Sequence, residues 1–529
     1  MGKQLKRLIF ALTFGLAALA GIAQAAPPAP RLDRSGPVPT LIVDGKPFLI
    51  IGGELGNSTA SDLDYLRPYW AKFDALHMNT VLAPVYWELI EPEEGKFDFT
   101  SVDGLLKDAR AADKRLVLLW FASWKNSQSS YAPSWVKRDS TRFPRAQTDD
   151  GTFLELLTPL SEDNRDADAR AFGALMAHLG RIDQNDRTVI MIQVENEIGM
   201  IPTARDFSPL AEAAWRTPVP ESVREAVGKN VGDWAALSPE LASAEEMFMA
   251  WHFARYVEAI ARAGKEAYDI PMYTNAALAR PGRVPGPGYP SAGPLPRTAK
   301  IWHAGAPSLD FLSPDIYFNN FVEWSNKYME TEPVLFVPET RSGDTAGANL
   351  FWMVGHHGGI GFSPFSIESI EEPDDLLLTS AYDVLSQLTP LVFERHGTNR
   401  IVGFVPPVTF EGEIDDSTQT FVIGDYKFIV NFVYPYTPKE DQNIAGHGGM
   451  ILQLAPEEFI IVGHGVEVSF EPADGKGWAG IDKSWEGTFE DGKWKPGRLL
   501  NGDQTHQGRL VRLPLGKFSI QRTTLYRYP

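Results

Sequence analysis

Short apolar runs alternate with helix-like segments from residue 48 to residue 394, and this alternation restricts the fold more than any other feature. Each run is continuously apolar and rich in β-branched residues, as in a strand buried on both faces. Eight runs are expected to be strands: 48–54, 79–85, 115–121, 189–196, 271–275, 309–317, 334–339 and 360–365. Strands that alternate with helices form parallel sheets, so the pattern predicts an α/β fold, a (β/α)₈ TIM barrel.

The pattern changes after Arg400, where helical spacing disappears. Short strand-like runs follow, separated by Gly, Asp and Pro turns, which is typical of an all-β sandwich. We therefore expect a signal peptide at 1–25, a catalytic barrel at 26–398 and a β-sandwich accessory domain at 399–529. The barrel segment should open with a hairpin around Asp44-Gly45 and carry long loops after strands 4 and 5.

The N-terminus has the three parts of a secretory signal peptide. Basic residues precede an apolar stretch at 8–22, and Ala23-Gln24-Ala25 supplies an Ala-x-Ala cleavage site. We expect cleavage after Ala25 and a periplasmic or secreted protein. A membrane anchor is the alternative, but the apolar stretch is short for a span. The rest of the chain has no apolar run of eighteen residues, so no membrane association is expected after cleavage.

The charge and the cysteine content exclude several functions. The net charge is −19, and loss of Lys3, Lys6 and Arg7 with the signal peptide takes it to −22. An acidic surface of this kind argues against binding nucleic acid or anionic lipid. Cysteine is absent from the sequence, which excludes disulfides, thiolate metal sites and a cysteine nucleophile. No His spacing suits a metal either, so we expect neither a metal nor another cofactor.

Polar side chains stand where seven of the eight expected strands end. In a TIM barrel these ends meet at the face that carries the active site. Buried carboxylates and amides there are costly unless they are paired, so a ring of them is hard to explain by core packing. The residues in question are Glu54, Tyr86 and Trp87, 123–126, Asn196 and Glu197, Asn275, Asp315 and Tyr317, and Glu339.

Glu197 and Glu339 are the expected catalytic pair. They follow strands four and seven, which we expect to face each other across the barrel mouth. Retaining glycosidases use two carboxyls about 5–5.5 Å apart, one as acid/base and one as nucleophile. For Glu197 to serve as the acid, its pKa must rise toward roughly 6, and the charge of Glu339 would raise it. Glu195 is expected to support the site, although strand alternation would point it inward as well.

Four segments resemble glycoside hydrolase family 35, the β-galactosidases. Residues 193–199, Gln-Val-Glu-Asn-Glu-Ile-Gly, are similar to its Gln-x-Glu-Asn-Glu-aromatic-Gly signature. Residues 87–99 resemble its second-strand motif, residues 122–136 its third-strand loop, and Val-Pro-Glu-Thr at 337–340 its nucleophile strand. The C-terminal segment looks like the accessory domain of a bacterial subgroup. The resemblance implies that Glu197 is the acid/base, Asn196 its sugar-binding neighbour and Glu339 the nucleophile.

The chain departs from the family pattern at positions that recognise sugar hydroxyls. Ile198 replaces an aromatic residue, Ser123 a galactose-binding Glu, Pro84 a Tyr, and Glu88 an Asn. We expect Glu54 and Tyr86 to restore the missing contacts. The full set of expected substrate-binding residues is Asn196, Glu54, Tyr86, Trp87, Trp124, Asn275 and Tyr317.

The resemblance therefore implies a retaining exo-β-galactosidase that removes terminal galactose from oligosaccharides, such as xyloglucan-type side chains of plant cell walls. One alternative is another retaining β-glycosidase of the same barrel type, acting on β-glucosides, β-mannosides or arabinosides. A second is a carbohydrate-binding barrel that has lost activity. The sandwich is expected to be a rigid packing partner for the barrel, with sugar binding as its alternative role.

Overall fold

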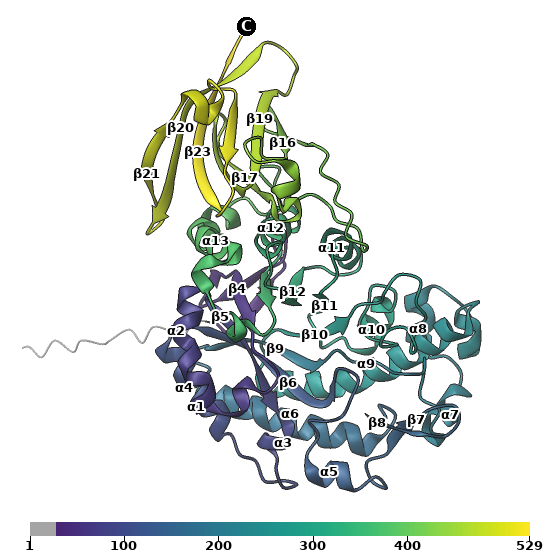
Figure 1. The fold of residues 1–529 in the computed structure, drawn as a ribbon. Helices are drawn as coiled ribbons and strands as arrows, with labels where there is room; N and C mark the ends of the chain where they lie inside the picture. Colours follow the sequence, from purple (N-terminus) through teal and green to yellow (C-terminus); the bar gives the residue numbers. More distant parts are fainter. Residues whose placement is uncertain (1–27) are drawn as a thin grey trace, which may run out of the picture.

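A computed structural model describes residues 28–529 (Figure 1). The expected signal peptide and its cleavage site lie outside these residues. No helix in the described part of the chain is both long and apolar enough to cross a membrane. A barrel forms the lower part of the molecule in Figure 1, and a β-sandwich packs against one side of it.

The expected TIM barrel is confirmed. Eight parallel strands close in the order β10-β11-β12-β13-β4-β5-β6-β9, with the chain visiting them in sequence. All eight expected strands are present, and the strand at 115–121 continues to Lys125. Their bounds are β4 (Ile50–Glu54), β5 (Thr80–Tyr86), β6 (Arg115–Lys125), β9 (Val189–Asn196), β10 (Met272–Ala277), β11 (Phe311–Ile316), β12 (Phe336–Thr340) and β13 (Gly361–Pro364).

Helices surround the barrel and cover the outer faces of its strands. The longest are α6, which packs between β6 and β9, and α9, which packs against α6. The helices are α1 (Leu63–Leu66), α2 (Trp70–Ala75), α3 (Trp87–Ile90), α4 (Thr100–Ala111), α5 (Ser134–Arg138), α6 (Glu162–Ile182), α7 (Pro209–Trp215), α8 (Glu221–Val227), α9 (Leu241–Ala267), α10 (Ala299–Gly305), α11 (Phe321–Met329), α12 (Ala346–Trp352) and α13 (Leu377–Phe393).

The expected N-terminal hairpin forms, but its second arm is shorter than predicted. β2 (Thr40–Val43) turns at Asp44-Gly45 into β3 (Lys46–Pro47), and β1 (Arg31–Asp33) pairs with the other edge of β2. The apolar residues after Pro47 leave this small sheet and enter the barrel as β4. They do so because a strand buried on both faces needs the barrel around it, which the small exposed sheet does not provide.

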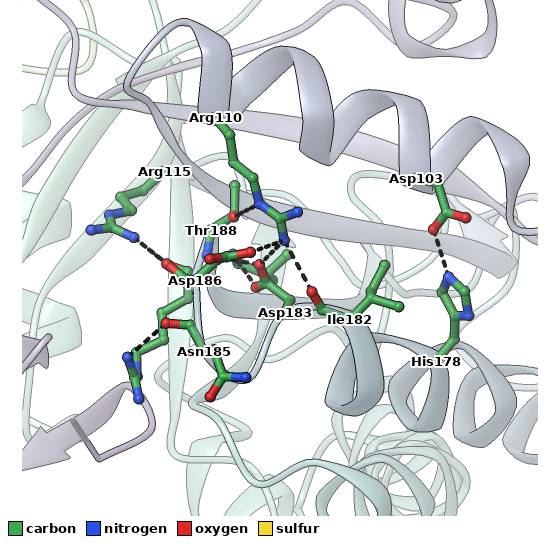
Figure 2. A network of polar contacts seen from close by, with 11 residues as sticks. Asp103, Arg110, Arg115, His178, Ile182, Asp183, Asn185, Asp186 and Thr188 are labelled. Atoms are coloured by element: carbon green, nitrogen blue, oxygen red, sulfur yellow. Dashed lines mark hydrogen bonds and ion pairs between the residues drawn. The ribbon is translucent and has the colours of Figure 1, made fainter. Parts of the chain in front are cut away.

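The loop that leads into β9 is held by a buried carboxylate, Asp183 (Figure 2). Its oxygens accept hydrogen bonds from the backbone N–H groups of Thr188, at 3.0 Å, and Val189, at 2.8 Å. Arg110 of α4 donates to the same carboxylate at 2.6 Å and also reaches the Thr188 hydroxyl. These bonds fix where β9 begins, and therefore which residues stand at its far end.

The C-terminal segment is the expected β-sandwich. One sheet has the order β14-β17-β18-β23-β20-β21 and the other β15-β16-β19-β22. A separate apolar core lies between them. The sequence did not predict β21, which is mostly exposed. The strands are β14 (Ile401–Phe404), β15 (Gln419–Ile423), β16 (Tyr426–Asn431), β17 (Gly448–Ala455), β18 (Glu458–His464), β19 (Val466–Pro472), β20 (Trp478–Glu490), β21 (Lys493–Leu500), β22 (Leu510–Leu513) and β23 (Ser519–Tyr528).

The sandwich and the barrel share one continuous apolar core. Residues of β17, β18 and β23 join the core of the barrel rather than that of the sandwich, through the packing of α12 and α13 on the larger sheet. At Gly355 and Gly403 the two backbones approach so closely that a Cβ on either residue would overlap the other segment. The two parts therefore form a tightly fitted interface.

Candidate active site

The two expected catalytic carboxyls meet at the mouth of the barrel. One oxygen from each of Glu197, Asp315 and Glu339 lies within 4.8 Å of the others. The expectation that strands four and seven face each other is wrong, because β10 and β11 lie between β9 and β12. The carboxyls converge nevertheless, and the intervening strands contribute Asn275 and Asp315 between them.

Glu339, at the end of β12, is held by three neutral donors. Its Oε1 accepts from the amides of Asn196, at 2.9 Å, and Asn275, at 3.2 Å. Its Oε2 accepts from the hydroxyl of Tyr317 at 2.8 Å. Three donors fix the orientation of this carboxyl. This is the arrangement that a nucleophilic carboxylate requires.

Lys125, the last residue of β6, brings a positive charge into this cluster. Its Nζ donates to Asn196 Oδ1 at 2.8 Å, and its side chain is almost fully buried. Burial acts to lower the pKa of Lys125, but the negative charges around it, with Glu339 and Glu54 the largest contributors, raise the pKa overall. The ammonium group therefore stays charged and balances the carboxylates.

Glu197 has the environment of an acid/base catalyst. Burial, followed by the charge of Glu339, raises its pKa to about 7. Its backbone N–H donates to Asn275 Oδ1 at 3.0 Å, and Asn126 donates a hydrogen bond to its Oε2. A carboxyl with this pKa holds its proton near neutral pH beside an ionised partner, as a glycosidase acid must. The expected rise is present, with burial rather than charge as its larger cause.

Glu195 turns away from the site. Both Glu195 and Glu197 have left-handed backbone conformations, with φ of 62° and 44°, which are uncommon for non-glycine residues. The kink breaks strand alternation and overturns the expectation that Glu195 points inward. Its oxygens instead accept from the backbone N–H groups of Ser123, at 3.2 Å, and Trp124, at 2.7 Å. Glu195 supports the end of β6, as the sequence predicted.

Glu54 and Asp315 add two fully buried carboxyls to the cluster. Burial, followed by the charge of Glu339, raises the pKa of each well above the ordinary value. No hydrogen-bond donor in the described chain reaches either oxygen of Glu54. Glu54 lies beside Glu339. Two neighbouring carboxyls repel each other when both are ionised, so these two need one proton between them. Glu54 therefore contacts Glu339 and not solvent.

The comparison with known families agrees with this geometry. Residues 40–257 match the model of glycosyl hydrolases family 35, and the matched part contains β4 to β9 and Glu197. Over these residues the barrel is similar to this family. Residues 378–512 match a second model, described as a domain of unknown function, DUF5597. That match runs from α13 through most of the sandwich.

Curated relatives of the chain are matched over part of their length. A β-galactosidase of Xanthomonas manihotis is 30% identical over 167 residues, which are 30% of this chain and 25% of that protein. Beta-galactosidase 17 of Arabidopsis thaliana is 29% identical over 168 residues, 30% of this chain and 21% of that protein. The chain thus aligns with about a quarter of the length of these relatives.

Solved β-galactosidase structures are similar at low sequence identity. The cold-adapted enzyme of Rahnella sp. R3 has a TM-score of 0.47 and 14% identity, covering 65% of this chain and 57% of that one. The enzyme of the psychrophilic Marinomonas ef1 has a TM-score of 0.45 and 12% identity, covering 66% and 60%.

The structure corrects the expectation that two tryptophans of the barrel bind substrate. Trp87 and Trp124 are both 0% exposed. The Trp87 indole donates to Glu91 at 3.0 Å, and that of Trp124 to the Leu157 carbonyl at 3.1 Å. Each follows a strand end, but its side chain points outward and fills the space between the barrel and its covering segments. Neither ring is open to a sugar.

The expectation that Tyr86 contacts the sugar is also corrected, whereas the expected sugar contact of Glu54 stays a prediction. Glu54 lies beside Glu339 and is fully buried, as are Asn196 and Asn275. The Tyr86 ring stacks on Tyr131 at 5.7 Å, and its hydroxyl is buried toward Ala60 and Ser61. Of the expected substrate-binding residues, Asn196, Asn275 and Tyr317 remain at the site, where all three hold Glu339.

The sequence placed Lys125, Asn126 and Asp315 among the polar residues at the strand ends but gave none of them a role in catalysis or binding. All three stand at or next to strand ends, so the position was visible in the sequence. This position alone indicates a functional role only weakly, because a polar residue after a buried strand is also typical of an ordinary loop. Only the spatial arrangement shows that Lys125 and Asn126 are directed at Asn196 and Glu197.

A cavity of about 420 Å³ opens beside Glu197, Asp315 and Tyr317. The long loop after β10 forms its other wall, with Arg280 and residues 286–290 among the lining residues. This loop is tied down by paired backbone hydrogen bonds between Met200 and Ser291. The cavity volume lies within the range of about 300–1,000 Å³ that is usual for ligand sites.

The carboxylate group also has the spacing of a cation site. Glu197, Asp315 and Glu339 each offer one ligand oxygen within the 4.8 Å separation. The chain already places the Lys125 ammonium in the same cluster, and Glu339 is saturated by Asn196, Asn275 and Tyr317. The charge balance is therefore provided by the protein, and the absence of a metal cofactor stays a prediction.

Proposed function

We propose that the chain is a retaining, exo-acting β-galactosidase. The observation that carries this proposal is the pairing of a protonated Glu197 with a donor-bound Glu339, with oxygens within 4.8 Å. Retaining enzymes have carboxyls about 5–5.5 Å apart, whereas inverting enzymes need about 6.5–9.5 Å to admit a water molecule. The family of the barrel supports the same reaction class.

In the first step, a carboxylate oxygen of Glu339 attacks the anomeric carbon and the glycosidic C–O bond breaks. Glu197 gives its proton to the departing oxygen. In the second step, the now ionised Glu197 takes a proton from water, whose oxygen attacks the anomeric carbon and releases Glu339. Asn196, which precedes Glu197 in the sequence and donates to Glu339, would bind the sugar 2-hydroxyl, a contact that strengthens in the transition state.

Galactose is the proposed sugar because the curated relatives are named β-galactosidases. A different β-glycosidase is the second candidate, and Ser123 favours it. The hydroxyl of Ser123 is buried and bonded to Asp168 and Tyr256 at 2.7 Å or less. It therefore supplies nothing to the pocket in place of the galactose-binding Glu expected there. Turnover of nitrophenyl β-glycosides of galactose, glucose, mannose and arabinose separates the two candidates.

Two measurements test the mechanism. NMR of the first product should show the β-anomer of galactose, and an α-anomer as first product would reject double displacement. Glu339→Gly and Glu197→Ala should both be nearly inactive. Azide should restore turnover of an activated galactoside in both variants, giving the α-galactosyl azide with Glu339→Gly and the β-galactosyl azide with Glu197→Ala. These products distinguish the nucleophile from the acid/base.

The natural substrate is proposed to be an oligosaccharide with terminal β-galactose, such as a xyloglucan-type side chain. We further propose that residues 1–25 direct the protein to the periplasm or the medium. Mass spectrometry of the protein recovered from the periplasm should give an N-terminus at Ala26. Recovery of an unprocessed chain beginning at Met1 would reject the signal peptide.

A further inference from the structure

A loop of the sandwich reaches the mouth of the barrel. It connects β14 to β15 and folds back on itself, with Val408 and Ile414 paired as a short antiparallel bridge. The Thr409 N–H donates to the Glu413 carbonyl at 2.8 Å, and the Asp415 N–H to the Pro407 carbonyl at 2.9 Å. These bonds give residues 407–415, which we name the sandwich loop, a defined shape.

The sandwich loop is attached to the barrel at the end of β11. The ring of Phe410 packs edge-on against Phe318 with centroids 5.0 Å apart. The Asn319 amide donates to the Phe410 carbonyl at 3.3 Å. A second junction lies nearby, where Asn443 of the sandwich donates to Asp344 of the loop after β12 at 2.9 Å. The sandwich loop is thus held against the segments that follow β11 and β12.

A cavity of about 350 Å³ lies at this junction and is built by both parts of the chain. The sandwich contributes Val408, Gly412, Ile414 and Ala445. The barrel contributes residues at and after the ends of β11 and β12. Among them are Phe318, which follows Tyr317, and Thr340, which follows Glu339. The volume is within the lower part of the range for ligand sites. Neither part of the chain forms this cavity by itself.

The junction cavity lies next to the catalytic cavity. Tyr317 and Phe318 line both of them. Tyr317 donates to Glu339 Oε2 at 2.8 Å, and its neighbour Phe318 is the residue on which the sandwich loop rests. A molecule whose reacting bond lies at Glu197 can therefore extend past Tyr317 into the junction cavity.

The lining suits a carbohydrate. Phe318, Val408 and Ile414 present apolar surface, on which the C–H face of a sugar ring can rest. Arg341 and Asn349 also line the cavity, and among residues 28–529 neither side chain has a hydrogen bond or an ion pair. An apolar wall with a few free donors is the usual composition of a small-molecule site.

We propose that the junction cavity binds the part of an oligosaccharide that lies beyond the hydrolysed galactose. The sandwich then acts in substrate selection in addition to packing against the barrel. The proposal rests on the proposed glycosidase function, since it places the reacting bond at Glu197 and Glu339. It gives a role to the part of the chain that matches the domain of unknown function.

The test compares two substrates with the same terminal galactose and an unactivated leaving group, methyl β-galactoside and a galactose-bearing xyloglucan oligosaccharide. The unmodified enzyme should have a higher kcat/KM for the oligosaccharide. Ile414→Trp places a bulky ring in the cavity, and Arg341→Ala removes its free donors. Each should lower the ratio of the two kcat/KM values at least tenfold, mainly through KM for the oligosaccharide.

Val422→Arg is the matched control, because Val422 is an exposed apolar residue of β15 that does not line the cavity. It should leave both kcat/KM values unchanged. The proposal is overturned if the unmodified enzyme does not prefer the oligosaccharide, or if the cavity variants lower both values equally. Absence of nitrophenyl galactoside turnover in the unmodified enzyme would instead reject the proposed function itself.

Discussion

Lys125 and Glu339 stand on opposite strands of the barrel and are joined through a single side-chain amide. The Asn196 oxygen accepts from Lys125 Nζ at 2.8 Å, while its nitrogen donates to Glu339 at 2.9 Å. The amide is therefore fixed in one orientation, since a flipped amide would lose both bonds. Asn196, the proposed sugar-binding residue, therefore links the buried positive charge of Lys125 to the proposed nucleophile, Glu339.

Removal of this charge should impair catalysis and change its pH dependence. Lys125→Met leaves the Asn196 amide without its second anchor and the carboxylates without their cation. We expect kcat/KM to fall on the order of 100-fold, as when a buried electrostatic contact is removed from an active site. Because Lys125 lowers the pKa of Glu197, the alkaline limb of the pH profile should also move to higher pH.

The control for this variant is Lys327→Met. Lys327 is paired with Glu323 on the exposed face of α11, so its loss should change neither kcat/KM nor the pH profile. A Lys125→Met variant with an unshifted alkaline limb would contradict the electrostatic role of Lys125.

The pKa of Glu197, about 7, predicts how activity depends on pH. The first step needs protonated Glu197, so kcat/KM should fall about tenfold per unit as pH rises beyond 7. The fall should be steep for an alkyl galactoside, whose leaving oxygen needs the proton. It should be nearly absent for 2,4-dinitrophenyl galactoside, which leaves unaided. Equal falls for the two substrates would show that another group controls the limb.

Sequence patterns predicted the barrel, the sandwich and the positions of Glu197 and Glu339, because strand periodicity and strand order determine which residues meet at one face. The directions of the side chains were not predictable in the same way. The left-handed backbone at Glu195 turns that residue outward, and Trp124 likewise points into the layer between β6 and α9. Such kinks depend on contacts between segments far apart in sequence, such as Glu195 with the Ser123 N–H.

Glu54 should support Glu339 as a protonated acid and not as a sugar contact. Burial and the charge of Glu339 raise its pKa, so at neutral pH it has a proton to donate. Glu54→Gln keeps a donor and should retain kcat within about tenfold, whereas Glu54→Leu removes it. A hydrogen bond to a charged group is worth about 1.5–3 kcal/mol, so the Leu variant should lose about 10- to 100-fold in kcat.

The split between kcat and KM distinguishes the two roles of Glu54. If Glu54 acts through Glu339 and does not touch the sugar, KM for the galactoside should stay nearly unchanged in both variants. If Glu54 bound the sugar, KM would rise in both. If Glu54 were ionised, the Gln variant would be as impaired as the Leu variant.

Asp183 should control the stability of the strand that carries Glu197. The Asp183 carboxylate accepts from the backbone N–H groups of Thr188 and Val189, and in Asp183→Asn one of these two N–H groups loses its acceptor oxygen. The substitution also removes the ion pair with Arg110. Loss of a hydrogen bond to a charged group costs about 1.5–3 kcal/mol, and the start of β9 becomes less fixed. We expect a lower urea midpoint for the Asn variant, with kcat reduced only after partial unfolding begins.

Asp186→Asn is the matched control, because Asp186 is more than half exposed and lies 3.3 Å from the same Arg110. Exposed pairs contribute about 0–1 kcal/mol, so its midpoint should stay close to that of the unmodified chain. Equal midpoints for the two variants would show that Asp183 does not anchor β9.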